Sequence, residues 1–376
     1  MKTLVLIDSN AIIHRAYHAL PKTMSTRSGE PTNAVYGFAT ALIKVLEDIK
    51  PDYIAASFDL AGPTFRHEQF ADYKATRVKA DQELYDQIPR VKEMLSIMEI
   101  PIYEKQGFEA DDTIGTIVRK IQDTRNKIQT YIVSGDKDIF QLIDGNIKVY
   151  NLRRGLSDTQ IVDREVIEKE YHLQPEDFID LKALAGDASD NIPGVPGIGP
   201  KTATTLLQTF GSLQELYSKI ADSLEKVGLI SKSEFSASAR TERDGLISKK
   251  IPNPKIEKLK IQKLTENWKL KIGNYDKKLT EMSSNLKIKS RVLELLIDFK
   301  DQAFLSQKLA TIHKEVPIEF NLDAAKWGDY DKASLREFFE KLNFRSLLRR
   351  FGIIEVDDKR KLKTEQAKRD KQLKLL

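Results

Sequence analysis

Residues 108–115 read Phe-Glu-Ala-Asp-Asp-Thr-Ile-Gly, and the organisation of the whole chain can be worked out from this run. It places three carboxylates, Glu109, Asp111 and Asp112, within four positions and directly before an apolar pattern of helical period. The pattern predicts a helix over 111–122 whose first turn is acidic.

A second acidic group follows about fifteen residues later. Residues 130–135, Thr-Tyr-Ile-Val-Ser-Gly, are typical of a buried strand, which delivers Asp136 and Asp138 at its carboxyl end. Capping of the helix N-terminus by Asp111 or Asp112 would explain one or two of the acids. It does not explain five, because unpaired buried carboxylates repel one another and are costly to desolvate. We therefore expect a divalent cation among them.

Two earlier apolar runs also end in an acid. Residues 3–8 end in Asp8, and residues 53–59 end in Asp59. Helical patterns lie between the strand-like runs, at 34–49, 83–98 and 111–122. This alternation predicts an α/β fold with a mostly parallel central sheet flanked by helices. Ligands bind beyond the carboxyl ends of the strands in such sheets, so Asp8, Asp59 and Asp136 should meet at one edge.

Composition narrows the chemistry. The 376 residues suffice for two domains, or for one domain with appendages. The chain has no cysteine, which excludes disulfides, thiolate metal sites and cysteine nucleophiles. With only five histidines, oxygen ligands should dominate any metal site, which favours Mg²⁺ or Mn²⁺ over Zn²⁺.

Location and net charge are less informative. No apolar stretch reaches membrane-spanning length and no signal peptide is evident, so we expect a cytoplasmic protein without a membrane partner. The net charge of +5 is weak evidence for a nucleic-acid partner. Acids gather in the first half, whereas Lys and Arg dominate from residue 250 onward.

Residues 64–79 mix aromatic and basic side chains. On a helix, Phe70, Tyr73, Lys74 and Arg77 would share one face. Aromatics that stack on bases beside cations that meet phosphates could form a surface for single-stranded nucleic acid. The alternative is a solvated amphipathic helix whose aromatics pack inward, and the segment taken alone favours this alternative.

Residues 175–210 carry the second strong motif. Asp187 and Asp190 lie three positions apart, so they would face the same way on a helical turn. Gly197 and Gly199, followed by a helix that begins with Lys201, allow a tight hairpin whose outward N–H groups bind phosphate without regard to sequence. A simple Gly-Pro-rich loop is the alternative, and the glycine–lysine spacing favours the hairpin.

The second half of the chain is less regular. Residues 225–289 are rich in Ser, Lys, Glu and Asn, with few apolar faces, and helix or strand character is only weakly indicated at 255–275. Helices are predicted at 291–312 and 334–351. The Lys-rich residues 357–376 are typical of a frayed helix or a disordered tail.

Three motifs occur together in one order. They are Phe-Glu-Ala-Asp-Asp-x-Ile-Gly at 108–115, Ser-Gly-Asp-Lys-Asp-x-x-Gln-Leu at 134–142 and Gly-Asp-x-Ser-Asp-Asn-Ile-Pro-Gly-Val-Pro-Gly-Ile-Gly-Pro-Lys-Thr-Ala at 186–203. In order and spacing they resemble the flap endonuclease family, and within it the 5′-nuclease domain at the N-terminus of bacterial DNA polymerase I. The similarity runs to about residue 220 and resumes near 291.

The resemblance implies a PIN-like nuclease fold with a helical arch, a helix-hairpin-helix subdomain and two metal ions, Mg²⁺ or alternatively Mn²⁺. Carboxylates matching one metal centre are Asp8, Asp59, Glu109 and Asp111. Those matching the second are Asp136, Asp138 and Asp187, with Asp112 and Asp190 near or between the two centres. Lys74 and Arg77 match the arch cations that approach the scissile phosphate, and we count Asp112 with them as catalytic.

The resemblance also implies DNA contacts. Tyr73 would stack on a base, and Arg15 would reach a phosphate. Hairpin residues expected to grip duplex DNA are Gly194, Gly197, Ile198, Gly199, Lys201 and Thr202. In the family this hairpin commonly binds K⁺ through backbone carbonyls. The implied activity is metal-dependent 5′-3′ exonuclease and flap endonuclease cleavage of DNA flaps, nicks and 5′ ends and of primer RNA on DNA.

These inferences give a domain plan. The expected regions are a nuclease domain at 1–172 with its arch at 64–80, a helix-hairpin-helix region at 173–224, a Lys-rich and partly disordered insertion at 225–289, closing helices at 290–356 and a basic tail at 357–376. No polymerase domain follows, so we expect a stand-alone nuclease or a domain of a longer polymerase. We also expect a monomer that works near the nucleoid with a DNA polymerase as a partner.

Rival functions remain open at this stage. They are a non-catalytic branched-DNA-binding module on the same fold, a single-strand ribonuclease, and a recruitment platform that uses the basic insertion and tail. All metal carboxylates are present, which argues against the first rival. The hairpin and the arch cations argue against the second.

Overall fold

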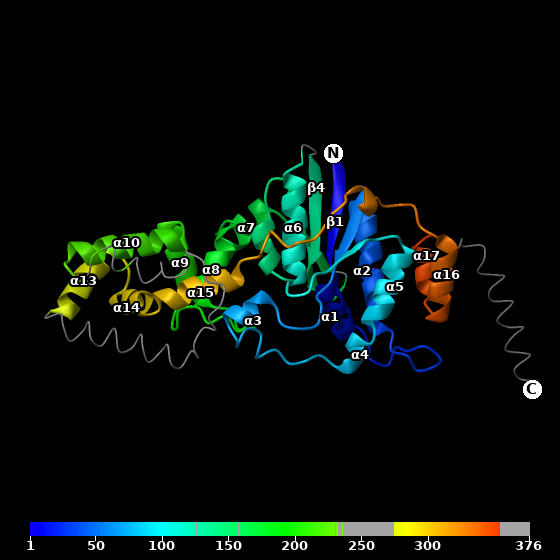
Figure 1. The fold of residues 1–376 in the computed structure, drawn as a ribbon, viewed down its shortest axis with the longest axis horizontal. Helices are drawn as coiled ribbons and strands as arrows, with labels where there is room; N and C mark the ends of the chain where they lie inside the picture. The colour runs from blue at the N-terminus through cyan, green and yellow to red at the C-terminus, as the bar shows by residue number, and fades with distance from the viewer. Residues whose placement is uncertain (125–126, 157, 230, 232–234, 236–273, 354–376) are drawn as a thin grey trace, which may run out of the picture.

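A computed structural model describes residues 1–124, 127–156, 158–229, 231, 235 and 274–353 of the chain. One end of the molecule is an α/β part, and the other is a bundle of helices that we call the helical part (Figure 1). None of the helices in the described ranges has both the length and the apolar character needed to cross a lipid bilayer.

The α/β part is built on a six-stranded sheet of order β3-β2-β1-β4-β5-β6. Its strands are β1 (Lys2–Asp8), β2 (Tyr53–Ser57), β3 (Ile102–Tyr103), β4 (Ile128–Ser134), β5 (Ile147–Arg154) and β6 (Asp158–Val162). The pairs among β3, β2, β1, β4 and β5 are parallel, and β6 runs antiparallel to β5. The sheet is thus mostly parallel, as the apolar runs predict.

The α/β part also contains helices, most of which pack on the two faces of this sheet. They are α1 (Ser9–Ala19), α2 (Asn33–Ile49), α3 (Phe65–Gln69), α4 (Gln82–Tyr85), α5 (Ile88–Ile97), α6 (Ala110–Gln122), the 3₁₀ helix η1 (Asp138–Leu142) and α7 (Arg164–Tyr171). Along β1, Val5 and Ile7 pack in the core under α1, α2 and α5, whereas Leu4 and Leu6 pack with α6. A strand buried on both faces needs an unbroken apolar run, which explains the composition of residues 4–7.

The helical part has its own core. It consists of α8 (Asp177–Ala185), α9 (Pro200–Phe210), α10 (Leu213–Lys226), α13 (Tyr275–Leu286), α14 (Ser290–Asp298) and α15 (Lys300–Ala310). The helix predicted at 291–312 is two helices that meet at Phe299. Leu279 and Met282 of α13 are buried in this core, so the predicted insertion ends earlier than 289. Most of that segment and the tail at 357–376 lie outside the described residues.

The chain then returns to the α/β part through residues 311–331, which we call the strap. The strap contains the short 3₁₀ helix η2 (Asp323–Ala325) and leads to α16 (Lys332–Lys341) and α17 (Arg345–Arg350). These two helices lie beside α2 and α5, at the end of the molecule away from the helical part (Figure 1). The single closing region predicted at 290–356 therefore divides between both parts. The single helix predicted at 334–351 is interrupted at Asn343, whose φ is 60°.

Candidate active site

Three aspartates arrive at one edge of the sheet, as expected. Asp8 is the last residue of β1, and Asp59 and Asp136 each lie two residues beyond the ends of β2 and β4. Because the three strands are parallel neighbours, their carboxyl ends coincide. The first turn of α6, with Glu109 as its N-cap, faces the same edge.

Asp8 and Asp111 lie deepest in this group. The Asp8 carboxylate is 5 % exposed and accepts hydrogen bonds from the Ser134 hydroxyl at 2.6 Å and from the Ala11 N–H at 3.1 Å. Burial and the neighbouring negative charges nevertheless raise the pKa of Asp8 to about 7. Burial and the charges of Asp8, Asp136 and nearby aspartates likewise raise the pKa of Asp111 far above its ordinary value. The local field therefore favours a positive charge at this position.

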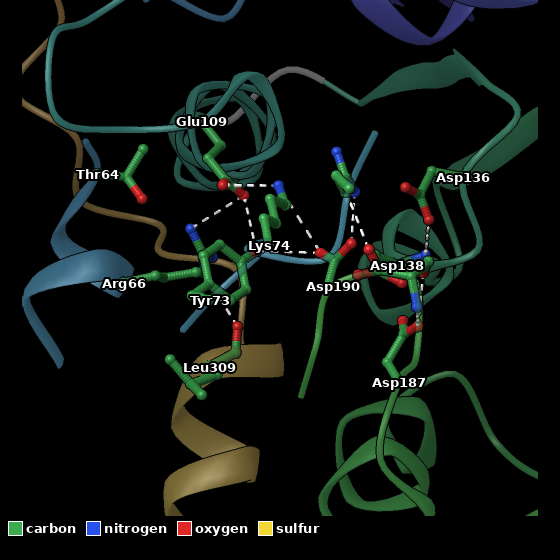
Figure 2. A network of polar contacts seen from close by, with 12 residues as sticks. Thr64, Arg66, Tyr73, Lys74, Glu109, Asp136, Asp138, Asp187, Asp190 and Leu309 are labelled. Atoms are coloured by element: carbon green, nitrogen blue, oxygen red, sulfur yellow. Dashed lines mark hydrogen bonds and ion pairs between the residues drawn. The ribbon is translucent and has the colours of Figure 1, made fainter. Parts of the chain in front are cut away.

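Asp136, Asp138 and Asp187 form a second group of carboxylates (Figure 2). Lys182 of α8 donates to both Asp138 and Asp187. Burial and the negative charge of Asp136 raise the pKa of Asp138 to about 7 despite this pair. Burial alone would also raise the pKa of Asp187, but Lys182 and Ser189 lower it to about 2. Lys182 thus supplies positive charge that the aspartates require.

Glu109 and Asp190 hold the arch segment. The Lys74 ammonium donates to Glu109 at 2.7 Å and lies 3.7 Å from Asp190, between the two carboxylates (Figure 2). Arg77 forms an ion pair with Asp190 and donates to the Ser189 carbonyl at 3.2 Å. The structure therefore brings both predicted arch cations to the carboxylate cluster.

The conformation of this segment differs from the predicted helix. Helix α3 ends at Gln69, and turns follow over 71–76. Lys74 has a φ of 56°, in the left-handed region, which no α-helix can contain. The helical face expected for Phe70, Tyr73, Lys74 and Arg77 is therefore wrong, although Lys74 and Arg77 do reach the site.

Tyr73 is a further correction. Its side chain is 3 % exposed, and its hydroxyl donates to Glu109 at 3.2 Å and to Asp190 at 3.1 Å. A ring buried in this way cannot stack on a base without leaving its pocket. Tyr73 instead orients two of the carboxylates, and the inward-packing alternative is right for this ring.

The predicted helical turn that carries Asp187 and Asp190 is also absent. An antiparallel bridge pairs Asp187 with Ile192, through N–H···O bonds of 2.9 and 2.8 Å, and residues 188–191 form the turn between them. The two aspartates consequently face different partners. Asp187 meets Lys182, whereas Asp190 meets Lys74, Arg77 and Tyr73.

Asp112 has a structural partner. It is fully buried and pairs with Arg66 through two hydrogen bonds of 2.8 Å. Its oxygens also accept from the backbone N–H groups of Glu109 at 3.0 Å and His313 at 2.8 Å. All of these bonds lie within the protein, and a catalytic role for Asp112 stays a prediction.

The carboxylates supply oxygen ligands, which are the ligands that Mg²⁺ and Mn²⁺ prefer. Among the described residues, no group of three or more Asp, Glu or His side chains is close enough to hold an ion as it stands. Lys74 and Lys182 lie between the carboxylates, where they offset part of the negative charge. The raised pKa values of Asp8, Asp111 and Asp138 show that charge remains to be balanced, so the residues fit a divalent cation.

A cleft of about 760 Å³ opens beside these carboxylates. Its walls carry the carboxylates of Asp136, Asp138 and Asp187 together with the basic or imidazole side chains of His14, Arg15, His18 and Lys137. A Cβ at position 135 would lie 2.3 Å from the Arg15 guanidinium, so Gly135 leaves room for that side chain. Arg15 thus lies where a phosphate that enters the cleft would meet it.

The hairpin between α8 and α9 is only partly open to a ligand. Gly194 is buried, and its N–H donates to the Ser306 hydroxyl at 3.0 Å. The Ile198 side chain is 3 % exposed in the core of the helical part. These two predicted DNA contacts are therefore structural residues. Gly197, Gly199 and Lys201 are exposed at the surface, and Thr202 is half-buried beside them.

The sequence did not predict two residues of the site, Arg66 and Lys182. Arg66 stands in the aromatic–basic segment, but nothing local shows that its partners are Asp112 and the chain 243 residues away. Lys182 lies five residues before Asp187, and that spacing is the one available signal. Arg66 is buried and Lys182 is partly buried. A cation in such a position indicates that it has acidic partners, but not which ones.

Comparison with known proteins identifies the family. The description "5'-3' exonuclease, N-terminal resolvase-like domain" matches residues 3–172, and "5'-3' exonuclease, C-terminal SAM fold" matches residues 173–252. The boundary between the two matches coincides with the transition from the α/β part to the helical part.

Curated relatives of this chain include the DNA polymerase I of two bacteria. DNA polymerase I of Bacillus subtilis is 35% identical over 351 residues, which are 93% of this chain and 32% of the relative. DNA polymerase I of Caldicellulosiruptor bescii is 34% identical over 355 residues, 94% of this chain and 34% of the relative. The chain therefore spans about a third of the length of these relatives.

A solved structure supports the fold. The flap endonuclease of bacteriophage T5, solved as a complex with DNA and metal ions, superposes with a TM-score of 0.54 at 16% identity and covers 91% of this chain and 100% of its own. A second structure of the same nuclease, co-crystallised with metal ions, gives 0.53. Because the two family matches together cover most of the chain, the chain belongs to the 5′-3′ exonuclease family of nucleases.

Proposed function

We propose that this chain is a structure-specific 5′-nuclease that hydrolyses phosphodiester bonds in DNA with a 5′ flap, a nick or a 5′ end, and in primer RNA on DNA. The observation that carries the proposal is the convergence of Asp8, Asp111, Asp136 and Asp138 at one edge of the sheet, beside a cleft that basic side chains also line. The membership of the chain in a nuclease family supports the same activity.

We propose Mg²⁺ as the metal, with Mn²⁺ as a substitute, and assign one ion to Asp8, Asp59, Glu109 and Asp111 and the other to Asp136, Asp138 and Asp187. Two such ions, when bound, supply a nucleophile at neutral pH and neutralise charge on the leaving oxygen. In the chain itself, Lys74 and Arg77 would turn from Glu109 and Asp190 toward the scissile phosphate. Arg15 would hold a phosphate at the mouth of the cleft.

The exposed hairpin residues supply the duplex contact in this proposal. Gly197 and Gly199 allow a close approach of the DNA backbone, and Lys201 adds charge at the start of α9. A K⁺ ion at the hairpin, a DNA polymerase partner and a monomeric state stay predictions from the family resemblance.

A flap-cleavage assay tests the function. A duplex with a 5′-labelled flap is incubated with the chain in Mg²⁺, with EDTA and the Asp111→Ala variant as controls. We expect a cut near the junction of single strand and duplex, lost in both controls. Tight binding without any cut would instead favour a non-catalytic branched-DNA-binding module.

A further inference from the structure

Arg66 is the most completely bonded side chain near the carboxylates, and it joins three segments that are far apart in sequence. It is 2 % exposed and lies at the start of the arch segment. Its side chain donates to Asp112, to Glu109 and to the backbone carbonyls of Leu309 and Thr311. The two carbonyls belong to the end of α15 and the beginning of the strap.

Every N–H of the Arg66 guanidinium has a partner. The Nε–H donates to Leu309 at 2.9 Å, one terminal nitrogen donates to Asp112 at 2.8 Å and Glu109 at 3.4 Å, and the other donates to Asp112 at 2.8 Å and Thr311 at 2.9 Å. Arginine alone has five donors in a planar fork, whereas lysine has three donors on a flexible stem. The site therefore depends on the geometry of arginine as well as on its charge.

The same helix, α15, also holds the hairpin. The Ser306 hydroxyl accepts from the Gly194 N–H at 3.0 Å, and the Gln302 side chain donates to the Gly194 carbonyl at 2.6 Å. One helix therefore bonds the hairpin along its length and Arg66 at its carboxyl end. Figure 2 shows Arg66 between Leu309 and the base of α6, close to Glu109.

We propose that Arg66 is a positioning residue that couples the placement of the hairpin and α15 to the orientation of Glu109, and so to metal binding at the active site. The inference rests on the proposed function, in which Glu109 holds one of the ions. Arg66 itself touches neither substrate nor metal in this scheme. It fixes the start of α6 through Asp112 and the strap through Thr311, which sets where the Glu109 carboxylate lies.

The test compares Arg66→Lys with the wild-type chain on the labelled flap duplex. Loss of a supporting contact around a metal site lowers metal affinity or activity by about 10–100-fold. We therefore expect Arg66→Lys to lower kcat, and to raise the half-saturating Mg²⁺ concentration, within that range. The flap KM, and the flap Kd measured in Ca²⁺, should stay within about twofold, since the exposed hairpin surface is unchanged. A purely structural role would lower the thermal midpoint without moving the Mg²⁺ requirement.

Arg119→Ala is the matched control. Arg119 and Glu315 also pair α6 with the strap, but at the surface, with side chains 48 % and 68 % exposed. We expect wild-type kcat and Mg²⁺ dependence from this variant, because an exposed pair contributes little. If Arg66→Lys does not fold, Asp112→Asn decides the question with the same measurements, since it keeps the size of the partner and removes its charge.

The outcomes separate the two proposals. If the wild-type chain does not cut the flap, the proposed function fails. If the wild-type chain cuts and the folded Arg66→Lys or Asp112→Asn variant keeps the wild-type kcat and Mg²⁺ half-saturation, the coupling through Arg66 is refuted and the function stands.

Discussion

Single carboxylates in this molecule behave unlike those at an ordinary surface. Asp8 is held by Ser134 and the Ala11 N–H, yet its pKa rises to about 7 because burial and neighbouring charges outweigh those bonds. In water an aspartate titrates near 3.9. The native state without metal therefore binds a proton at Asp8 more tightly than the unfolded state does, so its stability falls as the pH rises from about 4 to about 7.

This fall in stability with rising pH leads to a prediction for the metal-free protein. Asp8→Asn removes the buried charge, so at pH 8 in EDTA it should raise the free energy of unfolding by roughly 1–3 kcal/mol. The gain should shrink toward pH 5, where the wild-type aspartate is already protonated, and Mg²⁺ should abolish it. Urea unfolding at the two pH values measures the effect. Asp331→Asn, at an exposed helix cap where asparagine serves equally well, should change little.

A second prediction at this scale separates catalysis from binding. Asp136→Ala removes a proposed metal ligand, so flap cleavage in Mg²⁺ should fall by about a thousandfold or more. Flap affinity in Ca²⁺ or EDTA should stay within about threefold, because the hairpin and the basic side chains that line the cleft remain. Asp158→Ala, at the exposed start of β6, is the control. Loss of binding and cleavage together in Asp136→Ala would mean that the carboxylates serve the structure.

At the scale of elements, the hairpin between α8 and α9 depends on one backbone position. Gly194 has a φ of 58°, and a Cβ there would lie 2.2 Å from the Gly186 nitrogen. Gly199 has an ordinary φ of −93° and no neighbour within 4 Å of a Cβ. The backbone conformation therefore requires glycine at position 194 but not at position 199.

This contrast predicts different costs. Gly194→Ala should lower the free energy of unfolding by at least about 2 kcal/mol, because strain and a backbone clash add together. Gly199→Ala should stay within about 0.5 kcal/mol of the wild type. Chemical denaturation of both variants checks the difference. Equal losses of unfolding free energy in the two variants would show that the backbone conformation at Gly194 does not stabilise the hairpin.

Sequence patterns predict some elements well and others poorly, for physical reasons. The strands β1, β2 and β4 follow from unbroken apolar runs, and the acids at their ends follow from the parallel arrangement. The helix predicted across 64–79 is wrong because Lys74 adopts a left-handed backbone conformation. The sequence around a lysine does not indicate that conformation. The helical turn at Asp187 fails because the bridge to Ile192 depends on the surrounding fold.

The candidate site divides in the same way. The carboxylates could be predicted because several acids near strand ends are rare and costly without a cation. The burial of Tyr73 and Ile198 could not, since an aromatic or apolar residue in a motif is equally suited to a core and to a ligand surface. The link from Arg66 to Leu309 spans 243 residues, beyond the reach of any local pattern.

For the whole molecule, the last two described helices, α16 and α17, secure the α/β part rather than the helical part. Phe339 of α16 is fully buried, and its ring lies 6.2 Å from that of Phe344 and 5.3 Å from that of Phe351. These rings join the core that contains α2 and α5. The chain therefore completes its first part with its last described helices.

Truncating this ring tests that dependence. Phe339→Ala should lower the free energy of unfolding by about 3–5 kcal/mol, as for other buried phenylalanines. Phe320→Ala, on the half-buried strap, should cost clearly less. Urea unfolding gives both values. Cleavage by folded Phe339→Ala at low temperature should match the wild type, because α16 packs with α2 and α5 at the end of the molecule away from the helical part (Figure 1). A selective loss of kcat would contradict this.

The return of the chain along the strap has a consequence for synthesis on the ribosome. All of the carboxylates, from Asp8 to Asp190, leave the exit tunnel before Leu309 and Thr311 do. At about 5–20 residues per second, the nascent chain spends several seconds with all of its carboxylates synthesised and Arg66 still without those carbonyl partners. We expect the growing polypeptide to remain a poor nuclease during this interval, and cleavage to begin only after residue 313 has left the exit tunnel.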